Sequence, residues 1–157
     1  WTGFEDSEMA VDATNPNLTA ATLADRRFDL LDGDLELRAP GSAAISATTA
    51  ETAISLSAES LTAYKAVVDH SAIGGTVDGS NYWTVVIEAS DNNSNFVQVA
   101  TQKLAAAAKR HYLPLEGAGI AAAMAAAGET EALYIRVRAV ETGTTAGNLD
   151  YTAYLTL

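Results

Sequence analysis

The clearest alternation of apolar and polar positions lies near the C-terminus, between Leu133 and Leu157. It consists of two runs separated by the Gly- and Thr-rich stretch 142–147. Side chains alternate across a strand with period two, so each run predicts a strand with one buried face. We expect the pair to form a β-hairpin that ends the chain inside a sheet. The residues expected to face inward are Leu133, Ile135, Val137, Ala139, Leu149, Tyr151, Ala153, Leu155 and Leu157.

Short alternating runs continue the β pattern through the middle of the chain. The strongest covers residues 82–89, with Trp83, Val85 and Ile87 facing inward and Thr84 and Glu88 facing outward. Residues 91–95 have the composition of a hairpin turn, because Asn and Asp tolerate left-handed backbone. About eight or nine strands at this spacing predict a mainly β, single-domain, jelly-roll-like sandwich. The remaining strands are expected over residues 35–37, 43–48, 52–57, 61–71, 96–102 and 110–115.

One segment departs from the β pattern. Residues 118–127 are rich in alanine, which favours helix and fills a pleated face poorly. Ile120 and Met124 are four residues apart and share one side of a helix, and Gly128 can adopt the left-handed cap. We expect a short helix that plugs an open end of the sandwich, with a lid or contact element as the functional alternative.

The first residues differ from the rest. We expect an extended N-terminal arm over residues 1–31 and a sandwich domain over residues 32–157; a floppy terminus is the alternative, because termini need something to hold them in place. The arm carries apolar anchors that a solvated tail would not need, and we expect them to contact a partner. These anchors are Phe4, Leu18, Leu23 and Phe28.

Charge limits the partners of this protein. The 157 residues include nine Lys and Arg against twenty Asp and Glu, for a net charge of −11. Nucleic acids and anionic membranes both select basic surfaces, so we expect neither as a partner. No apolar run approaches the roughly 20 residues that span a bilayer. There is no cysteine, which excludes disulfides and thiol chemistry.

The sequence offers little for catalysis. Asp69, His70 and Ser71 are adjacent, but neighbours along a strand point to opposite faces, so we expect no catalytic triad. The other histidine, His111, follows two basic residues. We therefore expect no enzymatic activity.

The metal-ligating residue types also lack a suitable pattern. Asp29, Asp32, Asp34 and Glu36 place four carboxylates close together, but their spacing does not match a calcium-binding loop. We interpret them as a solvated acidic edge, with weak calcium binding by the turn 91–94 as a further alternative. We expect no metal and no cofactor.

Aromatic and basic side chains face away from the expected core. Tyr82, Tyr134 and Tyr154 are predicted to form either a carbohydrate-stacking platform or ordinary cross-strand pairs. Arg136 and Arg138 share the outward face of their strand. We expect Tyr134, Arg136, Arg138 and Tyr154 to form one outer surface of the closing hairpin that is open to a partner.

The segment from Tyr82 to Leu157 resembles jelly-roll capsid cement (decoration) proteins of tailed bacteriophages. The resemblance rests on the order of four motifs, residues 83–92, 109–115, 133–137 and 142–147. The helix at 118–127 and the longer arm depart from the family pattern.

The resemblance implies a virion protein without catalytic activity. Such a protein is made in the host cytoplasm and binds the outside of the major capsid protein lattice, commonly as a homotrimer, where it stabilises the phage head. The alternative is a carbohydrate-binding β-sandwich module of a tail or adhesin protein, which would use the three tyrosines.

Overall fold

A computed structural model describes residues 35–56, 64–144 and 146–156. The expected arm, residues 1–31, lies outside the described residues, and so does the boundary at residues 31 and 32. The four apolar anchors of that arm, Phe4, Leu18, Leu23 and Phe28, lie outside them as well.

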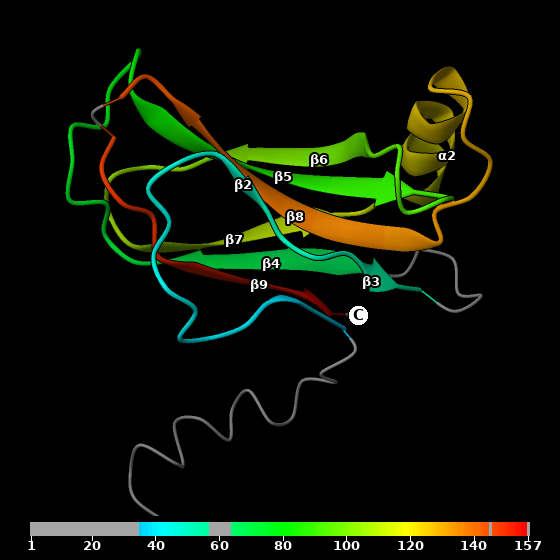
Figure 1. Ribbon diagram of the computed structural model, residues 1–157, viewed down its shortest axis with the longest axis horizontal. Coiled ribbons are helices and arrows are strands. Elements are labelled where there is room, and N and C mark those ends of the chain that lie inside the picture. Colours follow the sequence, from blue (N-terminus) through cyan, green and yellow to red (C-terminus); the bar gives the residue numbers. More distant parts are fainter. Residues whose placement is uncertain (1–34, 57–63, 145, 157) are drawn as a thin grey trace, which may run out of the picture. The chain divides into compact units, whose positions relative to one another are not determined.

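The described part of the chain is mainly β, with nine strands and one helix. Two antiparallel sheets pack together as a β-sandwich, which confirms the predicted fold class (Figure 1). In chain order the elements are β1 (Glu36–Arg38), β2 (Thr49–Ala50), β3 (Ile54–Ser55), β4 (Lys65–His70), β5 (Tyr82–Ser90), β6 (Val97–Lys103), β7 (Lys109–Pro114), α2 (Gly117–Ala126), β8 (Tyr134–Thr142) and β9 (Tyr151–Thr156).

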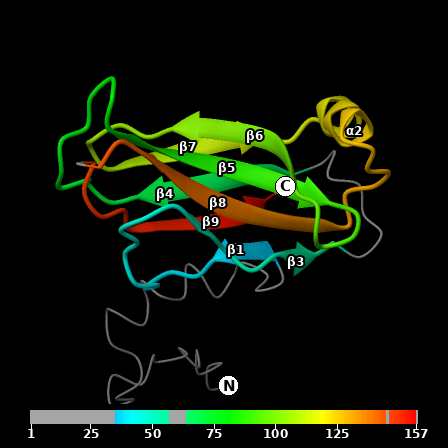
Figure 2. The same ribbon diagram turned by 45° about the horizontal axis from the view of Figure 1, so that its top comes forward.

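The strand order is that of a jelly roll. Sheet I has the order β1-β9-β4-β7, and sheet II has the order β2-β8-β5-β6, with β3 also pairing with β8. The antiparallel pairs are nested along the chain: β5 with β6, β4 with β7, β2 and β3 with β8, and β1 with β9. When a long antiparallel pair of strands folds over on itself in this way, its successive strand pairs alternate between two sheets. Figure 2 shows β1 beside β9 at the edge of sheet I.

Alternation along each strand builds the core between the sheets. Trp83, Val85 and Ile87 are fully buried on the inner face of β5, as predicted. Val137 lies opposite Ile87 on β8 and is equally buried. From sheet I, Ala153 contributes on β9. The inward face of each of these strands could therefore be predicted from period-two alternation alone.

The predicted C-terminal hairpin is wrong. β8 pairs with β5, where Val137 lies opposite Ile87, whereas β9 pairs with β4, where Ala153 lies opposite Val68. The chain therefore passes from sheet II to sheet I between β8 and β9. Alternation indicates which face of a strand is buried but not which strand lies beside it, so two strands in different sheets gave the pattern of a hairpin.

Of two smaller predictions, one is wrong and the other is confirmed. The strand expected over residues 43–48 is wrong, because only Ile45 forms a bridge there, to Leu149, and β2 begins at Thr49. The turn expected over residues 91–95 is confirmed: it connects β5 to β6, and Asn93 adopts a left-handed φ of 56°.

The predicted helix is confirmed as α2. Ile120 and Met124 are buried and belong to the hydrophobic core, and Gly128 follows with a φ of 80°. In both views α2 lies at one end of the sandwich (Figure 1, Figure 2). The helix therefore closes that end with two large apolar side chains, as the interpretation of it as a plug predicts.

Candidate functional site

One carboxylate organises the outer face of sheet II. Glu88 on β5 lies opposite Arg136 on β8, and Arg138 follows two positions along. The Nε of each arginine donates to a different oxygen of Glu88, both at 2.7 Å. Glu88 is only 4% exposed, so its charge is held between two guanidinium groups rather than by water. The cluster keeps one uncompensated positive charge.

Aromatic rings support the cations on this face. The Arg136 guanidinium lies 3.7 Å from the centre of the Phe96 ring, and the Lys103 ammonium lies 3.5 Å from that of Tyr82. Such stacking holds a cation in place without neutralising it. We call this surface the basic face; it comprises Tyr82, Glu88, Phe96, Lys103, Arg136 and Arg138. Its residues carry three cations and one carboxylate, with the Asp78 carboxylate also acting on Lys103, whereas the net charge of the chain is −11.

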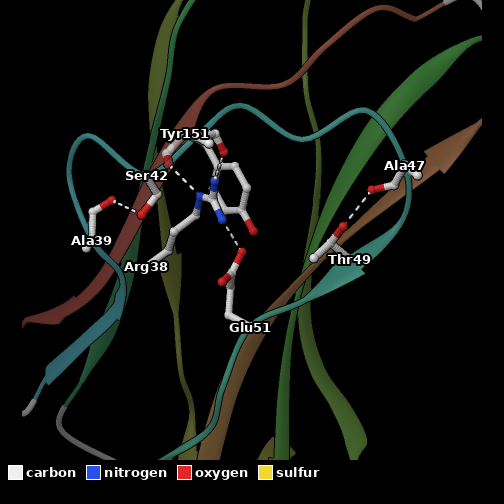
Figure 3. A network of polar contacts seen from close by, with 8 residues as sticks. Arg38, Ala39, Ser42, Ala47, Thr49, Glu51 and Tyr151 are labelled. Atoms are coloured by element: carbon white, nitrogen blue, oxygen red, sulfur yellow. Dashed lines mark hydrogen bonds and ion pairs between the residues drawn. The ribbon is translucent and has the colours of Figure 1, made fainter.

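A second polar cluster is centred on Arg38 of β1, which is buried beside Tyr151 of β9 (Figure 3). The Nε of Arg38 donates to the carbonyl of Tyr151 at 3.0 Å, and its guanidinium lies 4.6 Å from the Tyr151 ring centre. Arg38 also forms an ion pair with Glu51 and donates to the carbonyl of Ala43 at 2.6 Å. Burial raises the pKa of Tyr151, and the nearby Glu51 carboxylate adds to that effect. These contacts fasten the segment between β1 and β3 to sheet I, which is a structural role.

The two histidines stack beside this cluster. Their ring centres are 5.4 Å apart with the planes within 10° of parallel, and both residues are buried. The Nδ1 of His70 lies 2.8 Å from the carbonyl oxygen of Ser71. Burial lowers the pKa of His111, and the neighbouring His70 and Lys109 lower it further, so His111 is neutral at pH 7.

The neighbours of His70 point elsewhere, as the strand geometry predicted. Asp69 accepts a hydrogen bond of 2.9 Å from the Nε of Arg110 on the outer face of sheet I. The hydroxyl of Ser71 donates to Asp150. Asp69, His70 and Ser71 therefore do not assemble into a triad.

The carboxylates considered as metal ligands are not brought together. Asp29, Asp32 and Asp34 lie outside the described residues, and Glu36 lies on β1. In the turn after β5, Asp91 accepts hydrogen bonds from the backbone and hydroxyl of Thr130. Within residues 35–56, 64–144 and 146–156, no three His, Cys, Asp or Glu side chains are arranged to hold a metal ion.

The predicted row of three tyrosines does not exist. Tyr82 and Tyr134 lie at opposite ends of the β5–β8 pair, because Tyr82 faces Thr142 and Tyr134 faces Ser90. Tyr154 lies on β9, in the other sheet. A carbohydrate platform built from these three side chains is therefore excluded.

The predicted partner surface is divided in the same way. Tyr134, Arg136 and Arg138 share the outer face of sheet II, but Tyr154 belongs to the outer face of sheet I. The expectation that all four form one surface is wrong, and its reason is the error in pairing β8 with β9.

Sequence reasoning missed two residues that define the outer faces. Glu88 was predicted to point outward, which is correct, but its burial depends on arginines 48 and 50 residues further along the chain. Tyr112, 62% exposed, is the most exposed large apolar side chain in the described part of the protein. Its position between the inward-facing His111 and Leu113 was the available signal.

No protein-family model and no curated protein matches this chain in sequence. In the described part of the chain, no helix is long and apolar enough to cross a membrane.

Proposed function

We propose that this protein is a virion structural protein, a cement or decoration protein that binds the outside of a phage capsid. The observation that carries the proposal is the basic face on a chain whose net charge is −11. The resemblance of Tyr82–Leu157 to jelly-roll cement proteins and the jelly-roll strand order support it. Fold alone would not, because one fold serves many functions.

The basic face has the properties of a protein-docking surface. Glu88 fixes the Nε edge of both guanidinium groups, and 25% of the Arg136 side chain and 35% of the Arg138 side chain stay exposed. Arginines positioned in this way form paired hydrogen bonds to carboxylates with little further loss of side-chain freedom. Complementary charge also speeds the encounter with an acidic surface and fixes orientation. The matching partner is an acidic patch on the major capsid protein.

The protein would stay bound to the capsid because a homotrimer contacts several capsid subunits at once. A homotrimer presents three copies of the basic face, and linked weak contacts hold far more strongly than single ones. Each subunit then joins neighbouring capsid subunits, which stabilises the head against heat and the pressure of packaged DNA.

The test adds purified protein to capsids that lack it and measures DNA release on heating. We expect wild-type protein to raise the release temperature. The triple variant Glu88→Gln, Arg136→Gln, Arg138→Gln should bind at least about tenfold more weakly, because two docking arginines are lost. Replacing Glu88 as well avoids leaving a buried carboxylate without a cationic partner.

A matched control removes two positive charges elsewhere. Lys65→Gln with Lys109→Gln changes exposed side chains on sheet I and should leave capsid binding unchanged. Thermal unfolding of each variant verifies that the sandwich is intact. If depleted capsids release DNA at the same temperature as complete ones, the proposed function is wrong.

A further inference from the structure

The outer face of sheet I carries two tyrosines on either side of a valine. In the register of this sheet, Val67 on β4 lies directly opposite Tyr112 on β7 and directly opposite Tyr154 on β9. Adjacent strands are about 4.8 Å apart, so the Cα atoms of the two tyrosines, two strands apart, are separated by about 10 Å. Val67 is 1% exposed, whereas Tyr112 is 62% exposed. The row Tyr112–Val67–Tyr154 is therefore an aromatic strip, in which the well exposed Tyr112 and the partly exposed Tyr154 flank a buried valine.

Hydrogen-bonding groups line one side of this strip. In the next register position, Asp69 lies opposite Arg110 on β7 and opposite Thr152 on β9. Asp69 raises the pKa of Arg110, and the Tyr112 hydroxyl contributes a further hydrogen bond to that effect. The Arg110 and Asp69 side chains remain 47% and 35% exposed. Fixed donors and acceptors thus lie beside aromatic rings and remain open to solvent.

The charge on this face indicates which ligand it fits. Among the described residues of this face, the charged side chains are Glu36, Lys65, Asp69 and Arg110, two of each sign, so these strands contribute no net charge. The basic face on sheet II suits an acidic partner, but a neutral face on a chain of net charge −11 offers no attraction to phosphate or other polyanions. A neutral ligand with one apolar surface and a hydroxyl-rich edge is complementary to it. Sugar rings have that character.

We propose that the outer face of sheet I is a binding site for neutral oligosaccharides, in which pyranose rings stack on Tyr112 and Tyr154 and their hydroxyls bond to Arg110 and Asp69. Tyrosine suits this role because it combines an apolar ring with a polar tip. The site lies on the opposite sheet from the basic face. A subunit docked through sheet II therefore leaves sheet I free, and the proposal does not depend on the decoration role.

The test screens the isolated full chain against an array of neutral glucose, mannose and galactose oligosaccharides, followed by calorimetric titration of those bound. Tyr112→Ala should weaken binding about tenfold, as expected for the loss of one stacking ring. Tyr112→Phe keeps the ring and should stay within about threefold of wild type. Because Tyr112 is well exposed, neither change should alter the thermal unfolding of the protein.

Tyr134→Ala is the matched control, since it removes a partly exposed tyrosine from the outer face of sheet II. It should leave oligosaccharide binding unchanged. Absence of binding to every neutral oligosaccharide would overturn the proposal. Equal losses in the Tyr112→Ala and Tyr134→Ala variants would do so too. Capsid retention gives a separate readout: Tyr112→Ala should retain it fully, and its loss without any glycan binding would show that the face docks a protein instead.

Discussion

Individual side chains in this protein owe their roles to partners on other strands. Glu88 is a carboxylate on the outer face of a sheet, where solvent exposure is usual, yet two arginines of β8 enclose it. His70 and His111 are polar residues on the inner face, where they stack on one another. In both cases the environment, rather than the residue type, determines what the group can do.

Buried His111 predicts a loss of stability in mild acid. The pKa of His111 is lowered in the folded protein by burial and by His70 and Lys109, with Asp69 opposing. The unfolded chain, with an ordinary pKa of 6.5, therefore takes up a proton at higher pH than the native state does. Between residues 64 and 144, the Nε2 atoms of both histidines are buried without a hydrogen-bond partner. The free energy of unfolding should fall as the pH drops below about 6.5.

Urea unfolding of wild type and His111→Phe at pH 7.5 and pH 5.5 measures this effect. Phenylalanine keeps the stacked ring but cannot bind a proton, so the variant should lose less stability between the two pH values. An identical loss in both proteins would show that His111 does not contribute.

At the residue scale, the sequence could predict which side of a sheet each side chain faces, but not which residue of another strand lies beside it. The alternation around Trp83 placed Val85 inward and Glu88 outward, and both placements are confirmed. Nothing near Glu88 in the sequence identifies Arg136 and Arg138, because their contact depends on β5 and β8 lying side by side. The strand register determines which side chains share an outer face, and it places Tyr154 on a different sheet from Tyr134.

At the scale of elements, the segment 143–150 decides how the two sheets are joined. The φ of Gly147 is 80°, and its carbonyl accepts a hydrogen bond of 2.8 Å from the indole of Trp83. The loop before β5 passes so close that a Cβ on Gly147 would lie 2.6 Å from the backbone nitrogen of Gly75. This close approach ties the segment between β8 and β9 to the loop between β4 and β5.

Gly147→Ala should therefore destabilise the sandwich. Left-handed backbone costs a residue with a Cβ about 1–2 kcal/mol, and the contact with Gly75 adds to that. Chemical denaturation measures the difference in unfolding free energy. Gly74→Ala is the matched control, because its Cβ would meet nothing within 4 Å and it lacks a positive φ. Equal effects of the two substitutions would refute the argument.

Elements with local signals could be predicted, and those that depend on distant segments could not. Alanine content and the spacing of Ile120 and Met124 predicted α2, and the composition of residues 91–95 predicted the turn between β5 and β6. The partners of β8 and β9 depend on the path of the connection between them, and the contact of Gly147 with Gly75 that fixes this path involves a loop about 70 residues away in sequence. The hairpin prediction failed at that point.

At the scale of the whole molecule, the decoration proposal requires an assembly. Native mass spectrometry of the purified chain should give about three times the subunit mass of 16.3 kDa, because trimeric valency is what makes weak contacts with a shell sufficient. A monomer at micromolar concentration would contradict the trimer and favour an independent glycan-binding module. Glycan binding and capsid retention, measured on the Tyr112→Ala variant, then separate the glycan-binding role from the decoration role.

The nested strand order has a consequence for how the chain folds during synthesis. The innermost pair, β5 with β6, closes through a short turn, whereas β1 must wait for β9, which is made last of the nine strands. Loops that enclose more residues cost more entropy to close, and pairings distant in sequence slow folding. Until β9 leaves the ribosome, β4 has one edge without its neighbour, and β1 lacks the one described strand with which it pairs. A nascent chain thus exposes unpaired edges through most of its translation, which is when it is most open to aggregation and to chaperones.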